Sequence, residues 1–120
     1  MARILIIDDD AATRRILEHA LTSAGHEVAA ASDGEQGIQL HRLRPADLVI
    51  TDLFMPNKEG IETIAELTRE FPQLAIIAMS GGHATSASML KVAQLLGEVR
   101  VLEKPFDSET LLAAVNAALS

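Results

Sequence analysis

Cysteine, tryptophan and tyrosine are absent from this chain, and phenylalanine occurs only three times. Without cysteine there is neither a disulfide framework nor a thiolate metal site. The sequence also has no run of eighteen or more apolar residues, and its N-terminus lacks the basic segment and long apolar run of a secretory signal. We therefore expect a cytoplasmic protein that does not insert into membranes.

Positive charge is also scarce, because ten lysines and arginines stand against seventeen acidic residues and the formal net charge is −7. A phosphate backbone or an anionic membrane requires a basic surface on its partner. The charge balance therefore argues against direct binding of nucleic acid or membrane lipid and favours a basic partner protein. With 120 residues, 48% of them apolar, the chain is expected to form one domain over residues 1–120.

Short and nearly continuous apolar runs are typical of strands that are covered on both faces. Between these runs, apolar residues recur at three- and four-residue steps, which is typical of amphipathic helices. The pattern predicts strands over residues 3–7, 27–31, 46–52, 74–79 and 99–102, and helices over residues 11–24, 33–43, 59–70, 86–96 and from 107 or 108 onward. Buried strands that alternate with helices predict an α/β fold, a doubly wound parallel sheet with right-handed crossovers.

Polar residues follow the carboxyl ends of these strands, and in an open α/β sheet ligands bind beyond those ends. The residues are Asp8 and Asp9 after the first strand, Asp52 at the end of the third, Ser80 after the fourth and Lys104 after the fifth. Crowded carboxylates repel one another unless a cation lies among them. Mg²⁺ fits better than Ca²⁺, because it is usually held by one or two carboxylates with retained waters and a phosphate.

Asp52 is the predicted nucleophile, because carboxylates can form acyl phosphates. The metal and Lys104 would neutralise the phosphoryl oxygens, since catalysis of such transfers is mostly positioning and charge stabilisation. Ser80 could donate a hydrogen bond to the same group. The sequence therefore predicts a site that accepts and holds phosphate.

Four short motifs make the chain similar to the receiver domains of two-component response regulators over essentially its whole length. No single motif is specific, but their order and their places at strand ends are. The matching pieces are Ile6–Asp10, Asp52–Pro56 together with Gly60, Ala78–Ser80, and Lys104–Phe106. The resemblance implies a five-stranded, flavodoxin-like (βα)5 fold with the strand order 2-1-3-4-5.

The resemblance also implies a metal site. Asp9 would be a direct ligand of Mg²⁺, Asp8 a ligand through water, and Phe54 a ligand through its backbone carbonyl, next to the phosphoacceptor Asp52. Mn²⁺ would be an acceptable substitute for Mg²⁺. No other cofactor is expected.

For the phosphoryl group, the resemblance implies that Ser80 is the switch hydroxyl, that Lys104 contacts the phosphoryl oxygens, and that the bond between Lys104 and Pro105 is cis. The donor would be a phosphohistidine on a histidine kinase or a histidine phosphotransfer domain. The chain would then be a phosphorylation-controlled switch, and not an enzyme beyond its own phosphoryl transfer and dephosphorylation. A downstream protein or a fused output domain would receive the signal.

One position departs from the family pattern. Many receivers have a tyrosine or phenylalanine three residues before the lysine, where this chain has Val101. This departure favours an alternative, a constitutive adaptor that binds a partner without being phosphorylated. The complete set of acids, serine and lysine favours the switch.

Other interpretations fit less well. A hydrolase built from Ser80, His83 and Asp52 lacks the Gly-x-Ser-x-Gly motif, and a flavin carrier would need a phosphate-binding loop where three acids follow the first strand. The acids at residues 8–10 can also cap the following helix, and Lys104 can be a surface charge. The four histidines show no metal-ligand spacing, and we assign them no role.

Overall fold

The computed structural model describes residues 1–53, 60–80 and 99–120. The described strands form one sheet in the order β2-β1-β3-β4-β5, and every neighbouring pair is parallel. The strands are β1 (Arg3–Ile7), β2 (Glu27–Ala31), β3 (Leu48–Asp52), β4 (Ala75–Ser80) and β5 (Val99–Glu103). The predicted sheet and its strand order are therefore confirmed.

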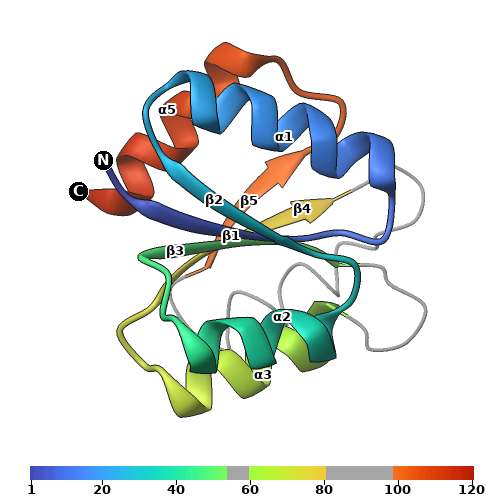
Figure 1. The fold of residues 1–120 in the computed structure, drawn as a ribbon, viewed down its shortest axis with the longest axis vertical. Coiled ribbons are helices and arrows are strands. Elements are labelled where there is room, and N and C mark those ends of the chain that lie inside the picture. Colours follow the sequence, from blue (N-terminus) through green and yellow to red (C-terminus); the bar gives the residue numbers. More distant parts are fainter. Residues whose placement is uncertain (54–59, 81–98) are drawn as a thin grey trace.

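Helices cover both faces of this sheet. They are α1 (Ala11–Ser23), α2 (Gly34–Leu43), α3 (Gly60–Glu70) and α5 (Ser108–Leu119). In Figure 1, α1 and α5 lie on one face of the sheet and α2 and α3 on the other. This arrangement confirms the doubly wound α/β class. The helix predicted over residues 86–96 lies outside the described residues.

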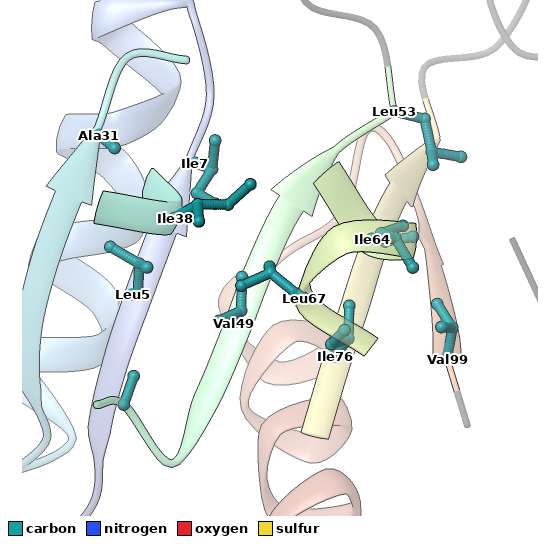
Figure 2. Packing of buried hydrophobic residues seen from close by; sticks show 12 residues of the cluster. Leu5, Ile7, Ala31, Ile38, Val49, Leu53, Ile64, Leu67, Ile76 and Val99 are labelled. Carbon is teal, nitrogen blue, oxygen red and sulfur yellow. The ribbon is translucent and has the colours of Figure 1, made fainter. Parts of the chain in front are cut away.

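The central strand β3 is buried along its whole length. Leu48 and Ile50 belong to the core cluster that includes residues of α1 and α5, whereas Val49 belongs to the cluster that includes residues of α2 and α3. Figure 2 shows Val49 with Ile64 and Leu67 of α3 in this second cluster. A strand between two helical layers needs apolar side chains on both faces, which explains its continuous apolar run. The strand therefore delivers its last residue, Asp52, from a rigid core.

Aspartate side chains cap the start of two of these helices. Asp33 caps α2 by accepting a hydrogen bond from the Gln36 backbone N–H, and Asp107 caps α5 by accepting one from the Thr110 backbone N–H. Helix α1 ends at Ser23, and Gly25 follows with φ 95°, a backbone conformation that glycine adopts at low cost.

Strand β3 begins at Leu48, two residues later than predicted. The Ala46 backbone N–H is donated to Nδ1 of His41 at 3.0 Å. The His41 side chain is buried, and its ring meets that of Phe71 edge-on with a centroid distance of 4.4 Å. The absence of a metal-binding role for His41 stays a prediction, but this histidine joins α2 to the start of β3.

His41 is expected to make the stability of the protein depend on pH. Burial lowers its pKa from the ordinary value of 6.5, the Glu70 carboxylate opposes this shift, and the Arg3 charge adds to it. Since the folded-state pKa lies below that of the unfolded chain, the stabilisation is present above pH 6.5 and is lost as the pH falls through the folded-state pKa. We expect the free energy of unfolding to decrease from pH 6.5 downward, by at most about 1.4 kcal/mol per pH unit for one proton.

Urea titrations followed by far-UV circular dichroism at a series of pH values measure this dependence. The His41→Asn variant should lose the part of the slope below pH 6.5 that belongs to this ring. The exposed His19 of α1 offers a matched control, and His19→Asn should keep the slope. Equal slopes in wild type and His41→Asn would refute the prediction.

Candidate functional site

The predicted site residues meet at the carboxyl edge of the sheet. Asp8 follows β1, Asp52 is the last residue of β3, Ser80 is the last residue of β4, and Lys104 follows β5. Because β1, β3, β4 and β5 are consecutive neighbours in a parallel sheet, their ends lie side by side. The strand order therefore brings residues far apart in the sequence to one place.

Lys104 connects the two buried acids of this site. Its Nζ lies 3.1 Å from Asp8 Oδ2 and 3.1 Å from Asp52 Oδ2. Its backbone N–H donates to the Ser80 carbonyl at 2.7 Å, so the same residue is also attached to the end of β4. The peptide bond between Lys104 and Pro105 is cis, as the resemblance predicted.

The Asp8 carboxylate is completely buried. Burial raises its pKa, the hydrogen bond from the Asp10 backbone N–H and the Lys104 charge lower it, and the Asp52 charge raises it again, with a net increase. A buried carboxylate with a raised pKa gains from any further positive charge placed next to it. Asp8 is therefore a group that a cation would stabilise.

Lys104 alone does not balance the charge of the site. Burial lowers its pKa, but the carboxylates of Asp52 and Asp8 outweigh this effect and raise it, so the ammonium stays protonated at neutral pH. Asp8, Asp9 and Asp52 each offer a carboxylate oxygen, and these oxygens lie within 4.8 Å of one another. Three negative charges and one positive charge leave a net charge of −2. The oxygen donors and this charge fit a hard divalent cation.

The acidic run after β1 serves two purposes. Asp10 caps α1, because its Oδ2 accepts hydrogen bonds from the Thr13 backbone N–H at 3.3 Å and from Thr13 Oγ1 at 2.6 Å. The hydrogen bond from the Thr13 side chain lowers the pKa of Asp10. The cap that the sequence allowed for residues 8–10 is thus Asp10, which leaves Asp8 and Asp9 for the acidic cluster.

Ser80 is buried at the end of β4, next to β3 and β5. Its neighbour in the sheet on β5 is Glu103, directly before Lys104. Val101, which stands where many receivers have an aromatic residue, is half-buried and pairs with Ala78. The backbone carbonyl of Phe54 and the residue His83 lie outside the described residues, so their predicted places remain predictions.

Two residues beside the site were not singled out by their chemistry in the sequence. Arg14 of α1 donates from Nη1 to the Asp8 carbonyl at 2.7 Å. Gly60 begins α3 so close to β3 that an added Cβ would overlap the Asp52 carbonyl oxygen and the Leu53 Cα. Gly60 belongs to a motif of the resemblance, whereas Arg14 had no signal beyond its position in the first turns of an amphipathic helix.

Two cavities of about 670 and 630 Å³ lie at the opposite edge of the sheet, where the strands begin. The first is lined by Ile76, Arg100 and Ser120, among others, and the second by Met1, His26 and Asp47. Neither includes a residue of the acidic cluster. Within the described part of the chain, no helix combines the length and the apolar character that a membrane span requires.

Comparison with known proteins gives consistent matches. A family model described as the response regulator receiver domain matches residues 4–116. The chain is 33% identical over 120 residues to Protein PilH of Pseudomonas aeruginosa, with 100% of this chain and 99% of PilH covered. It is 36% identical over 119 residues to the DNA-binding transcriptional regulator NtrC of Azospirillum brasilense, with 99% of this chain but only 24% of NtrC covered.

Among solved structures, the chemotaxis protein CheY4 of Vibrio cholerae aligns with a TM-score of 0.91 and 29% sequence identity. The alignment covers 99% of each chain. The chain thus spans nearly the whole of CheY4 and PilH, and about a quarter of NtrC.

Proposed function

Because this chain belongs to the response regulator receiver domain family of two-component systems, we propose that it is a switch controlled by phosphorylation of Asp52. Receiver domains are signalling domains and not classical enzymes. The single observation that carries the proposal is the position of Lys104 Nζ, 3.1 Å from Asp52 and 3.1 Å from Asp8 within a cluster of three acids. This arrangement supports attack by Asp52 on a phosphoryl group whose negative charge the neighbouring Lys104 ammonium would compensate.

Asp52 would attack the phosphorus of a phosphohistidine. A bond forms between a carboxylate oxygen and phosphorus, the phosphorus–nitrogen bond breaks, and the donor imidazole leaves with its electron pair. The Asp52 side chain is 12% exposed, so the donor has access to it, while its core strand keeps it in a fixed position. Lys104 provides a positive charge next to the attacking carboxylate and would pair with the phosphoryl oxygens.

Receiver domains generally bind Mg²⁺ at an acidic cluster, and Asp8, Asp9 and Asp52 form such a cluster here. In this chain the cation would be held by these carboxylates and the backbone carbonyl of Phe54, with Mn²⁺ as a substitute. When bound, it supplies positive charge to the phosphoryl oxygens. The chain's own contribution is to hold oxygen donors of net charge −2 together at a rigid sheet edge.

The response to phosphorylation would begin at Ser80. An acyl phosphate carries roughly one and a half to two negative charges in place of the single charge of the Asp52 carboxylate, and the Ser80 hydroxyl, at the end of the neighbouring strand β4, would donate to it. Such a new interaction shifts the population of conformations at the strand ends. With Val101 on β5, the signal would leave the domain without an aromatic ring that turns inward.

Receiver domains interact with histidine kinases or phosphotransfer proteins, and we propose such a protein as the donor for this chain. The chain matches 24% of NtrC and 99% of PilH, so both a fused output domain and a separate downstream protein are suitable recipients of the signal. The net charge of −7 argues against nucleic acid as a direct partner of this domain. The cytoplasmic location stays a prediction.

The proposal is tested by incubating the purified protein with acetyl phosphate and Mg²⁺. We expect intact-protein mass spectrometry to show the gain of one phosphoryl group, because the acidic cluster needs a cation before a phosphate can approach it. EDTA should prevent this gain, and Mn²⁺ should restore it. A protein that gains no phosphoryl group, or gains it equally in EDTA, would contradict the proposal.

A constitutive adaptor is the second candidate function, and the observation that favours it is Val101 in place of an aromatic residue. The two functions differ in how partner affinity responds to a mimic of the phosphoryl group. A switch should change its affinity for a partner when beryllofluoride and Mg²⁺ are added. An adaptor should bind equally well with and without them.

A further inference from the structure

Arg14 holds both ends of the connection between β1 and α1. Its backbone N–H donates to the Asp10 carbonyl at 3.0 Å, the first hydrogen bond of the helix. Its side-chain Nη1 reaches further back and donates to the Asp8 carbonyl at 2.7 Å. Because helical side chains point toward the N-terminus of their helix, a residue in the first turns of α1 can reach the end of β1 in this way.

The Asp8 carbonyl belongs to the peptide that joins Asp8 to Asp9, two of the three acids in the cluster. Other contacts fix Asp8 itself, because its N–H donates to Ala31, its Oδ1 accepts from Asp10 and its Oδ2 accepts from Lys104. Asp9 lies beyond the last paired residues of β1 and β2 and is exposed. The orientation of the peptide before it decides where its carboxylate points.

We propose that Arg14 is a positioning residue of the cation site, which orients the Asp8–Asp9 peptide and so directs the Asp9 carboxylate toward Asp8 and Asp52. This inference rests on the proposed function, because it assigns a role toward the cation that phosphorylation needs. Arg14 does not contact the cation. It acts through the backbone of its neighbours, as groups outside the ligand shell commonly do.

Because Arg14 is positively charged, its replacement tests the proposal by whether cation binding becomes stronger or weaker. By charge alone, replacing an arginine near an acidic cluster with a neutral residue should strengthen cation binding, since one repulsion is removed. Loss of a positioning hydrogen bond should weaken it. The neighbouring Arg15 has the same charge on the same helix turn but is exposed, so Arg15→Gln measures the effect of charge by itself.

The experiment titrates Mn²⁺ into the unphosphorylated protein and follows free Mn²⁺ by electron paramagnetic resonance. Arg14→Gln should weaken Mn²⁺ binding by about tenfold, the low end of what loss of such a supporting group costs. Arg15→Gln should bind as tightly as wild type or more tightly. Arg14→Lys keeps the charge on a shorter side chain, and its affinity for Mn²⁺ should fall by about threefold, half of the effect of Arg14→Gln on a logarithmic scale.

Far-UV circular dichroism shows whether each variant is folded. If Arg14→Gln does not fold, the affinity of Arg14→Lys for Mn²⁺ tests the inference instead. Its charge is unchanged, so any loss of affinity would come from the changed geometry of the side chain. The inference would be overturned if Arg14→Gln bound Mn²⁺ as tightly as Arg15→Gln or more tightly. If Arg14→Lys is the variant that folds, it would be overturned by an affinity for Mn²⁺ equal to that of wild type. A wild-type protein that binds no Mn²⁺ would overturn the cation site of the proposed function itself.

Discussion

Replacing Asp52 with asparagine is expected to abolish phosphoryl uptake and, at the same time, to stabilise the metal-free protein by about 1 kcal/mol. The amide cannot form an acyl phosphate in place of the carboxylate. The stabilisation follows from the charges of the site, where Asp8, Asp9 and Asp52 share Lys104 as the cation that contacts two of them. Removing one of three neighbouring negative charges relieves repulsion that the folded protein otherwise has to bear.

Both effects are measured on the same protein preparation. Intact-protein mass spectrometry after treatment with acetyl phosphate and Mg²⁺ reports phosphoryl uptake, and urea unfolding in EDTA reports stability. Asp47→Asn is the matched control, because Asp47 accepts a hydrogen bond from the Arg3 backbone N–H at the opposite edge of the sheet. It should be phosphorylated like wild type and should not gain stability. Phosphorylation of the Asp52→Asn protein would show that another residue is the acceptor.

Gly60→Ala is expected to reduce the free energy of unfolding by about 3 kcal/mol, the upper range for overpacking in a core. A Cβ at this position would overlap the Asp52 carbonyl oxygen and the Leu53 Cα, and it would lie 2.9 Å from the Leu53 carbonyl carbon. All three are backbone atoms at the end of β3 or directly after it, and backbone atoms cannot move aside as a side chain can. Relief of the overlap requires the end of β3 to shift, and Asp52 shifts with it.

Gly37→Ala in α2 is the matched control for this effect. Its Cβ would also meet close contacts, but these are with Cδ1 and Cγ1 of the Ile7 side chain. Alanine favours a helix by about 1 kcal/mol over glycine, which offsets part of the crowding. In thermal and urea unfolding, Gly60→Ala should therefore be much less stable than Gly37→Ala. Of the two variants, only Gly60→Ala should also be phosphorylated more slowly than wild type. Similar losses in the two variants would show that the contact with β3 is not what requires glycine.

The elements of the fold were predictable because buried parallel strands leave a simple record in the sequence. The short apolar runs at residues 3–7 and in β3 predict strands that helices cover on both faces. The order of the strands in the sheet could not be predicted from such runs. Alternation alone predicts parallel pairing and crossovers, but the order 2-1-3-4-5 came from the resemblance to receiver domains, since strand order depends on contacts between distant segments.

The candidate site was predictable for a related reason, because each of its acidic and basic residues lies within two positions of the end of an apolar run. Two hydrogen bonds between a side chain and the backbone, outside the helix caps, escaped prediction. The bond from Arg14 to the Asp8 carbonyl and the bond from Ala46 to His41 have no periodic signal and need no particular spacing. The acids at residues 8–10 show the same limit, since the sequence allowed both a cap and a metal site and only the structure assigns the cap to Asp10.

The contacts of Lys104 determine when, during synthesis of the chain, the candidate site can be completed. Lys104 is separated by 96 residues from Asp8 and by 52 residues from Asp52, and it contacts both. During synthesis, the acids of β1 and β3 leave the ribosome long before the lysine that neutralises them. A nascent chain that stops before β5 therefore carries Asp52, the proposed phosphoacceptor, without the lysine that contacts it. If Asp52 accepts a phosphoryl group as proposed, the complete site is therefore expected only after nearly the whole domain has been made.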